Sequence, residues 1–260
     1  MSDTPVWIGT SWKMNKTIDE ARDYADRLTA SPIPPGVRAF VLPPHTALRA
    51  VRDRLPADSP ILLGAQNAHW ASEGAGTGEI SMRMIKDAGA VLVEMGHSER
   101  REHFGETDAT VTLKARAALD HGLQPLICVG EPASVRAAGR AKAFVTAQVR
   151  AAIATVAPDE MHGVLVAYEP VWAIGVGGRA ATPEEVAPVM RAVAEELGDH
   201  ASGAGRAALL YGGGVDTDNA SGLLCESHTD GLFVGRAGWS AAGLRQLIEI
   251  AATHEATPRR

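Results

Sequence analysis

The stretch VWIGTSWKMN, residues 6–15, joins a short apolar run to a polar segment that carries Lys13. Residues 6–9 show none of the polar alternation that marks a half-exposed strand. A continuous apolar run of this length is typical of a parallel β-strand buried on both faces. We therefore expect residues 6–9 to form such a strand and Lys13 to follow its carboxyl end.

Similar apolar runs recur along the rest of the chain, at residues 37–43, 61–67, 91–96, 123–130, 163–169, 207–213 and 231–235. Segments with helical spacing separate them. Thr17 and Glu20 have the spacing of a capping box at the start of a helix, and Pro183 with two following glutamates marks the first turn of another. Further helices are expected at residues 80–88, 111–118, 133–156 (the longest), 218–224 and 241–251, with a shorter one at 46–55.

The alternation of strands and helices predicts the fold class. Eight such units in 260 residues, without a linker, favour one α/β domain over residues 1–260, a single (β/α)₈ barrel. A doubly wound open sheet is the alternative. It is disfavoured because the first strand–helix turn lacks G-x-G-x-x-G and no G-x-x-x-x-G-K-[ST] motif occurs in the chain.

Composition excludes several classes of partner. The net charge of −6, without a basic tract, argues against a nucleic-acid partner. No apolar stretch is long enough to span a membrane, and the N-terminus does not resemble a signal peptide. The two cysteines, Cys128 and Cys225, form neither a disulfide framework nor a metal pattern. We expect both to be buried, reduced thiols of a cytoplasmic protein that uses no metal and no cofactor.

Candidate catalytic residues follow three of the predicted strands. Lys13 follows the first, His97 the fourth and Glu169 the sixth, and barrel enzymes carry their chemistry at the carboxyl ends of the strands. Glycine-rich turns follow the last three strands and can offer backbone N–H groups to a phosphate. A carboxylate, an imidazole and an ammonium beside a phosphate site suit proton abstraction next to a carbonyl.

Eight motifs carry a family resemblance: WKMN (12–15), GAQN (64–67), GTGE (76–79), GHSERR (96–101), CVGE (128–131), YEPVWAIG (168–175), YGGGV (211–215) and LFVGR (232–236). Through them the chain resembles triosephosphate isomerase over nearly its full length. The resemblance implies that Glu169 is the base, that His97 polarises the carbonyl and moves protons between the two oxygens, and that Lys13 adds positive charge while paired with Glu99.

The same resemblance implies a lid over the substrate at residues 170–180, with Gly175 offering an N–H group to the phosphate. It also implies a homodimer, in which Thr77 reaches Ser11 and His97 of the other chain. Backbone N–H groups at the ends of the last two strands can face the phosphate, at Gly214, Gly235 and Arg236.

Several residues depart from the family pattern around the ligand. Ser11 stands where the family has asparagine, Gly214 where it has serine and Arg236 where it has glycine. The lid reads AIGVGGRA (173–180) instead of AIGTGKTA, so its usual lysine is lost. A smaller side chain at position 11 would leave room for one more hydroxymethyl group on the reacting carbon, and the serine hydroxyl could bind it.

The opening GTSWKMNKT also resembles the branch of the family that acts on L-erythrulose 1-phosphate in erythritol and related tetritol breakdown. The leading hypothesis is therefore an isomerase that interconverts L-erythrulose 1-phosphate and D-erythrulose 4-phosphate. Ordinary triosephosphate isomerase is the alternative, and a non-catalytic sugar-phosphate-binding regulator is a minor one.

Overall fold

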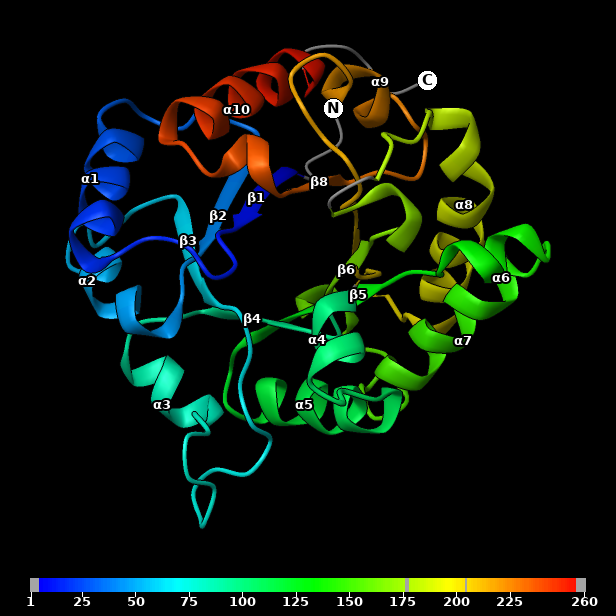
Figure 1. Ribbon diagram of the computed structural model, residues 1–260, viewed down its shortest axis with the longest axis horizontal. Helices are drawn as coiled ribbons and strands as arrows, with labels where there is room; N and C mark the ends of the chain where they lie inside the picture. The colour runs from blue at the N-terminus through cyan, green and yellow to red at the C-terminus, as the bar shows by residue number, and fades with distance from the viewer. Residues whose placement is uncertain (1–4, 176–177, 204, 256–260) are drawn as a thin grey trace.

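Parallel strands close into a barrel at the centre of the protein (Figure 1). A computed structural model describes residues 5–175, 178–203 and 205–255. Within these residues the barrel has eight strands: β1 (Val6–Ser11), β2 (Val37–Leu42), β3 (Ile61–Ala65), β4 (Leu92–Met95), β5 (Gln124–Val129), β6 (Leu165–Tyr168), β7 (Ala208–Tyr211) and β8 (Gly231–Val234). Each strand pairs with the next in the chain.

The closure of the barrel depends on β1, which pairs with β2 on one side and with β8 on the other. Ile8 lies opposite Ala39 in β2 and opposite Leu232 in β8. The predicted (β/α)₈ barrel is therefore confirmed, and the alternative of an open doubly wound sheet is wrong. A closed sheet has no unpaired edge strand. Its apolar strands therefore expose no edge at which another chain could pair and aggregate.

Helices surround the barrel on its outside (Figure 1). They are α1 (Ile18–Thr29), α2 (Leu48–Arg52), α3 (Met82–Asp87), α4 (Ser98–His103), α5 (Asp108–Asp120), α6 (Ala133–Ala137), α7 (Ala141–Ile153), α8 (Pro183–His200), α9 (Ala220–Leu224) and α10 (Ala241–Glu255). Short 3₁₀ turns lie at η1 (His45–Ala47), η2 (Met161–Gly163), η3 (Val171–Ala173) and η4 (Arg236–Gly238).

Helix starts agree with the sequence signals, but one long helix is broken. The Thr17 hydroxyl caps α1 and Glu20 returns the bond, so the predicted capping box is confirmed. Residues 133–156 were expected to form the longest helix, and this is wrong. They form α6 and α7, because Gly139 adopts a φ of +70° that an α-helix cannot contain. Among the residues that the structure describes, the longest helix is α8.

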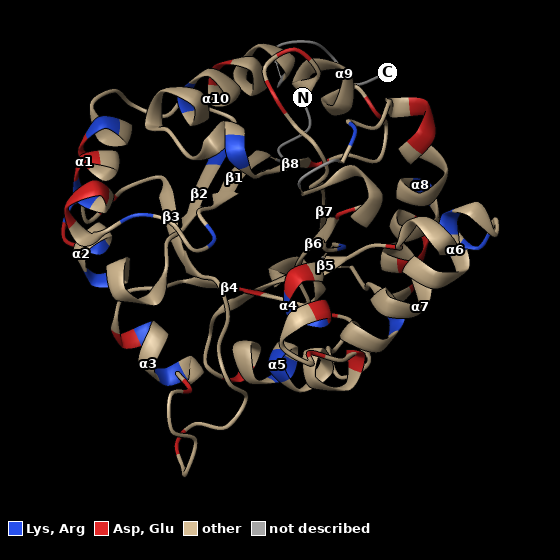
Figure 2. Cartoon of the chain, viewed as in Figure 1, with Lys and Arg blue, Asp and Glu red and all other residues tan. Residues whose placement is uncertain are grey.

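The inside of the barrel is a separate apolar core. Alternate strand residues point inward and fill it, among them Trp7, Phe40, Leu92, Leu126 and Phe233. The other set faces the helices and forms the larger outer core. In Figure 2 the charged residues lie mostly on the helices and loops, with both signs interspersed.

The two cysteines differ in their surroundings. Cys128 is buried as expected, but Cys225 is exposed, so the prediction of two buried thiols is wrong for the second. Cys225 is the C-cap residue of the short helix α9, and its side chain lies at the surface of the protein. Within the described ranges, no helix is both long enough and apolar enough to cross a membrane.

Candidate active site

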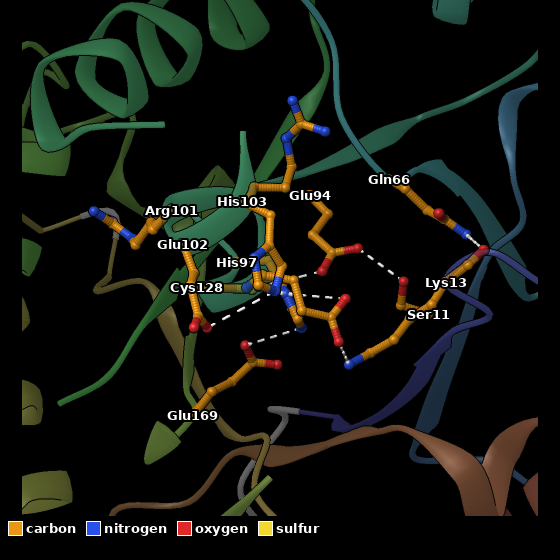
Figure 3. Close-up of polar contacts among 12 residues, drawn as sticks. Ser11, Lys13, Gln66, Glu94, His97, Arg101, Glu102, His103, Cys128 and Glu169 are labelled. Carbon is orange, nitrogen blue, oxygen red and sulfur yellow. Dashed lines mark hydrogen bonds and ion pairs between the residues drawn. The ribbon is translucent and has the colours of Figure 1, made fainter. Parts of the chain in front are cut away.

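Three side chains predicted from the sequence meet at the carboxyl end of the barrel. Lys13 follows β1, His97 follows β4 and Glu169 follows β6. Nε2 of His97 lies 3.6 Å from Oε2 of Glu169 (Figure 3). All three side chains line one cavity of about 250 Å³. The barrel therefore brings together a carboxylate, an imidazole and an ammonium group from distant parts of the chain.

Lys13 is presented by a strained loop. Its φ of +53° lies in the left-handed region, which costs a non-glycine residue roughly 1–3 kcal/mol. The amide of Gln66 stabilises this conformation, because its Nε2 donates 2.9 Å hydrogen bonds to the carbonyls of Lys13 and Leu42. The Lys13 ammonium lies 2.6 Å from Oε1 of Glu99, as predicted. The GAQN motif thus holds the loop that the WKMN motif forms.

His97 is held as a neutral imidazole with a defined tautomer. The backbone N–H of Glu99 donates a 3.1 Å hydrogen bond to Nδ1 of His97, so the ring proton is placed on Nε2, on the Glu169 side. Burial first, and then the positive charge of Lys13, lower the pKa of His97 to about 4. A neutral Nε2–H group can donate to a substrate oxygen at neutral pH.

Glu169 is a buried carboxylate without a strong partner. The residue is 5% exposed, and within the described residues its Oε2 accepts no hydrogen bond. Burial and then the nearby charge of Glu94 raise its pKa to about 8. Such a carboxyl group is poised to exchange a proton near neutral pH.

The surroundings of Glu169 are fixed by the YEPVW and CVGE motifs. Glu131 is fully buried and accepts hydrogen bonds from the Tyr168 hydroxyl and from Nε1 of Trp172 at 2.8 Å. Gly212 approaches from the other side: a Cβ atom there would lie 2.7 Å from Cγ of Glu169. The expected lid begins here, and its residues 176–177 lie outside the described residues.

The predicted phosphate-binding residues line the same cavity as the catalytic candidates. Gly175 comes from the start of the lid, Gly214 from the turn after β7, and Gly235 and Arg236 from the turn after β8. Nε1 of Trp239, just after η4, donates a 3.0 Å hydrogen bond to the carbonyl of Ser11. This bond ties the last turn to the loop that carries Lys13.

Ser11 has a partner that the sequence interpretation missed. The Ser11 hydroxyl donates a 2.9 Å hydrogen bond to Oε2 of Glu94 (Figure 3). Glu94 lies on β4 and is 2% exposed. Burial raises its pKa to about 7, while the bond from Ser11 and the charge of Lys13 oppose the increase. A signal was present, because Glu94 is the one charged residue in the apolar run 91–96.

Thr77 lies apart from the site of its own chain. It belongs to the segment between β3 and α3, which projects from the barrel wall in Figure 1. Residues 70–79 of this segment are all exposed. The remaining predicted site residues gather around the cavity, and this loop alone points away from it.

The fold and the site define a barrel enzyme with a buried carboxylate and a neutral imidazole at the mouth of the barrel. The family model for triosephosphate isomerase matches residues 6–251 of the chain. The chain therefore belongs to the triosephosphate isomerase family, and it is an isomerase.

Close relatives carry a more specific name. The chain is 51% identical to L-erythrulose-1-phosphate isomerase of Mycolicibacterium smegmatis, over 96% of this chain and 94% of the relative. It is 47% identical to the protein of that name from Rhizobium meliloti, and 45% identical to the one from Brucella abortus. Each of these two matches covers 96% of this chain and 98% of the relative.

Proposed function

We propose that this protein interconverts L-erythrulose 1-phosphate and D-erythrulose 4-phosphate. The observation that carries the reaction type is the pairing of a buried carboxylate with a neutral Nε2–H imidazole, Glu169 with His97, over one cavity. The names of the relatives at 45–51% identity support the four-carbon substrate.

The first step is proton abstraction by Glu169 from C3 of the substrate. The C3–H electron pair forms a C2–C3 double bond, and the carbonyl pair moves onto the C2 oxygen. The Nε2–H group of His97 gives a proton to this oxygen and takes one from the C3 oxygen. The protonated Glu169 then delivers its proton to C2, which leaves the carbonyl at C3. The positive charge of Lys13 stabilises the enediolate between the two steps.

The phosphate binds at the opposite end of the cavity. Backbone N–H groups of Gly175, Gly214 and Gly235 donate to its oxygens, and Arg236 adds positive charge. Glycine at these positions lets the backbone approach the phosphate closely. The lid at residues 170–180 excludes water from the enediolate and so prevents loss of the phosphate.

We further propose a homodimer in which the loop of residues 70–79 covers the site of the other subunit. A second cavity of about 240 Å³ beside Lys13 is bordered by two exposed apolar residues, Met14 (96% exposed) and Phe104 (68% exposed). Such side chains are unfavourable in water and suit an interface. Thr77 on the projecting loop is the residue we expect near Ser11 and His97 of the partner.

The cell context follows from the substrate and the thiols. A ketotetrose phosphate would arise from oxidation and phosphorylation of a tetritol, so we place the reaction in tetritol breakdown. Both cysteines are free thiols, which suits the reducing cytoplasm.

The test is kcat/KM on two substrates with one preparation, L-erythrulose 1-phosphate and dihydroxyacetone phosphate. We expect a strong preference for the tetrulose phosphate. A strong preference for the triose phosphate would instead identify a triosephosphate isomerase, the activity that gives the family its name. The variant Ser11→Asn should reduce turnover of the tetrulose phosphate far more than that of the triose phosphate, because asparagine fills the space for the fourth carbon. Ser227→Asn, an exposed change away from the cavity, is the control.

A further inference from the structure

Glu94 occupies an unusual place for an ionisable group. It lies on the strand that contributes Leu92 to the inner core of the barrel, and residues two apart on a strand point to the same face. Its carboxylate contacts Ser11 at 2.9 Å and the thiol of Cys128 at 3.9 Å, both also at the inward face. Glu94 therefore forms the polar floor of the active site, directly above an apolar core.

The stability of the fold does not explain why a carboxylate is buried at position 94. No ion pair within 4.0 Å involves Glu94 in the part of the chain that the structure describes, and Oε1 has only the weak S–H donor of Cys128. A buried acid in such a setting is destabilising, and an apolar side chain of similar size would pack at least as well. The carboxylate thus has spare hydrogen-bonding capacity that a ligand could use.

The carboxylate is within reach of a substrate bound at the catalytic residues. Glu94 lines the cavity of about 240 Å³, together with Ser11, Lys13 and His97. The last three residues also line the cavity that contains Glu169 and the glycine turns. The two cavities therefore share the side chains of Ser11, Lys13 and His97, and Glu94 contacts one of these shared residues, Ser11, directly.

The chemistry of that group follows from the orientation of the substrate. With the phosphate at the turns after β7 and β8, the carbonyl lies at Lys13 and His97, and the remaining end of the molecule points toward β1 and β4. In a tetrulose phosphate the reacting carbon carries a further hydroxymethyl group at this end, whereas in dihydroxyacetone phosphate the reacting carbon is itself the end of the molecule. A hydroxyl is a donor, and a carboxylate is the strongest acceptor a side chain can offer it.

We propose that Glu94, oriented by Ser11, accepts a hydrogen bond from the terminal hydroxyl of the ketose phosphate and so selects a four-carbon substrate over a three-carbon one. This inference rests on the proposed function. A site built around a buried acceptor discriminates strongly against an analogue without the donor, because the acceptor is then left unpaired.

The experiment compares wild type with Glu94→Leu on three substrates. They are L-erythrulose 1-phosphate, its analogue with a terminal methyl in place of the hydroxymethyl group, and dihydroxyacetone phosphate. For wild type we expect kcat/KM to fall about 100-fold or more when the hydroxyl is removed. For Glu94→Leu we expect about a 100-fold loss on the natural substrate, and little difference between it and the methyl analogue. Glu94→Gln keeps a hydrogen-bond acceptor but loses the charge. Its kcat/KM on L-erythrulose 1-phosphate should lie between the values for wild type and for Glu94→Leu.

The control variant is Glu160→Gln. Glu160 pairs with Arg116 and precedes the amino end of β6, away from the cavity. We expect the ratios of kcat/KM between the three substrates to be the same for Glu160→Gln as for wild type. Melting temperatures of all variants show whether each one is folded.

The outcomes separate the two proposals. Wild type that does not turn over L-erythrulose 1-phosphate would overturn the proposed function and this inference with it. Wild type that does so, alongside a Glu94→Leu variant that still distinguishes the hydroxyl from the methyl group, would overturn the inference alone. A folded Glu94→Leu variant that loses all three substrates equally would also overturn it, because Glu94 would then serve catalysis and not selection.

Discussion

Nε2 of His97 lies 3.6 Å from Oε2 of Glu169, and the two side chains are 7% and 6% exposed. The distance is too long for a hydrogen bond, so neither group satisfies the other. Burial drives their pKa values in opposite directions, down to about 4 for the imidazole and up to about 8 for the carboxyl. This divergence suits one neutral donor and one titratable base in the same cavity.

The pH dependence of kcat/KM should reflect Glu169 in the free enzyme. A base acts in its ionised form, so the rate constant should rise with pH through about 8. The substrate phosphate titrates near pH 6 and gives a separate, lower step. Glu94→Gln should move the upper step to lower pH, because the charge of Glu94 raises the pKa of Glu169. An upper step that stays in place in this variant would contradict the coupling.

The imidazole of His97 should remain neutral in solution down to about pH 5. Its pKa is about 4, and Nδ1 accepts a hydrogen bond from the backbone of Glu99. ¹⁵N spectra recorded across pH 5 to 9 should show one unchanging Nε2–H tautomer for this ring. His97→Gln identifies the signal. A ring that gains a proton near pH 6 would show that the site is more hydrated than the structure indicates.

Gly212→Ala should reduce kcat about 10- to 100-fold with little change in KM. The added Cβ would lie 2.7 Å from Cγ and 3.0 Å from Oε1 of Glu169, so the base must move. Gly198→Ala is the matched control, because a Cβ there meets no atom within 4 Å. Gly198 lies in the last turn of α8, where alanine should leave the stability of the fold unchanged or slightly increased. Wild-type kcat in Gly212→Ala would mean that the base has room to adjust.

Glu94→Gln should stabilise the protein increasingly as the pH rises from 5 to 8. Burial raises the pKa of Glu94 from 4.5 to about 7, so the folded state binds this proton more tightly than the unfolded chain. The associated stability is complete below pH 4.5 and is lost as the pH rises through 7. Glutamine carries no charge to bury, and the gain should reach at most about 3 kcal/mol. Chemical denaturation at the two pH values measures it, and a gain of equal size at both would exclude titration of Glu94 as the cause.

Local sequence patterns predicted the eight strands and the positions of the catalytic candidates, but they missed α4 and joined α6 and α7 into one helix. Continuous apolar runs predict buried parallel strands, because a strand covered on both faces has no polar side. The positions of Lys13, His97 and Glu169 after such runs place them at one end of a barrel before any coordinates are known. Their roles came from motif resemblance, and they remain proposals here.

Pairings between distant residues could not be read from the sequence. Gln66 holds the carbonyl of Lys13, and Glu131 holds Tyr168 and Trp172. Gln66 and Glu131 lie within the GAQN and CVGE motifs, but nothing in the neighbouring sequence indicates which distant residues they bind. The break at Gly139 was also missed, because alanine-rich segments on both sides of it have high helix propensity.

The sequence by itself determined the barrel, the edge on which the chemistry lies and the residue types available there, since these depend on periodicity and on strand order. Only the tertiary structure decided that Ser11 meets Glu94, 83 positions away, at the floor of the site. The closure of the barrel brings β1 and β4 together across its interior. The protonation and the hydrogen bonding of the buried Glu94 carboxylate depend on the groups that face it there.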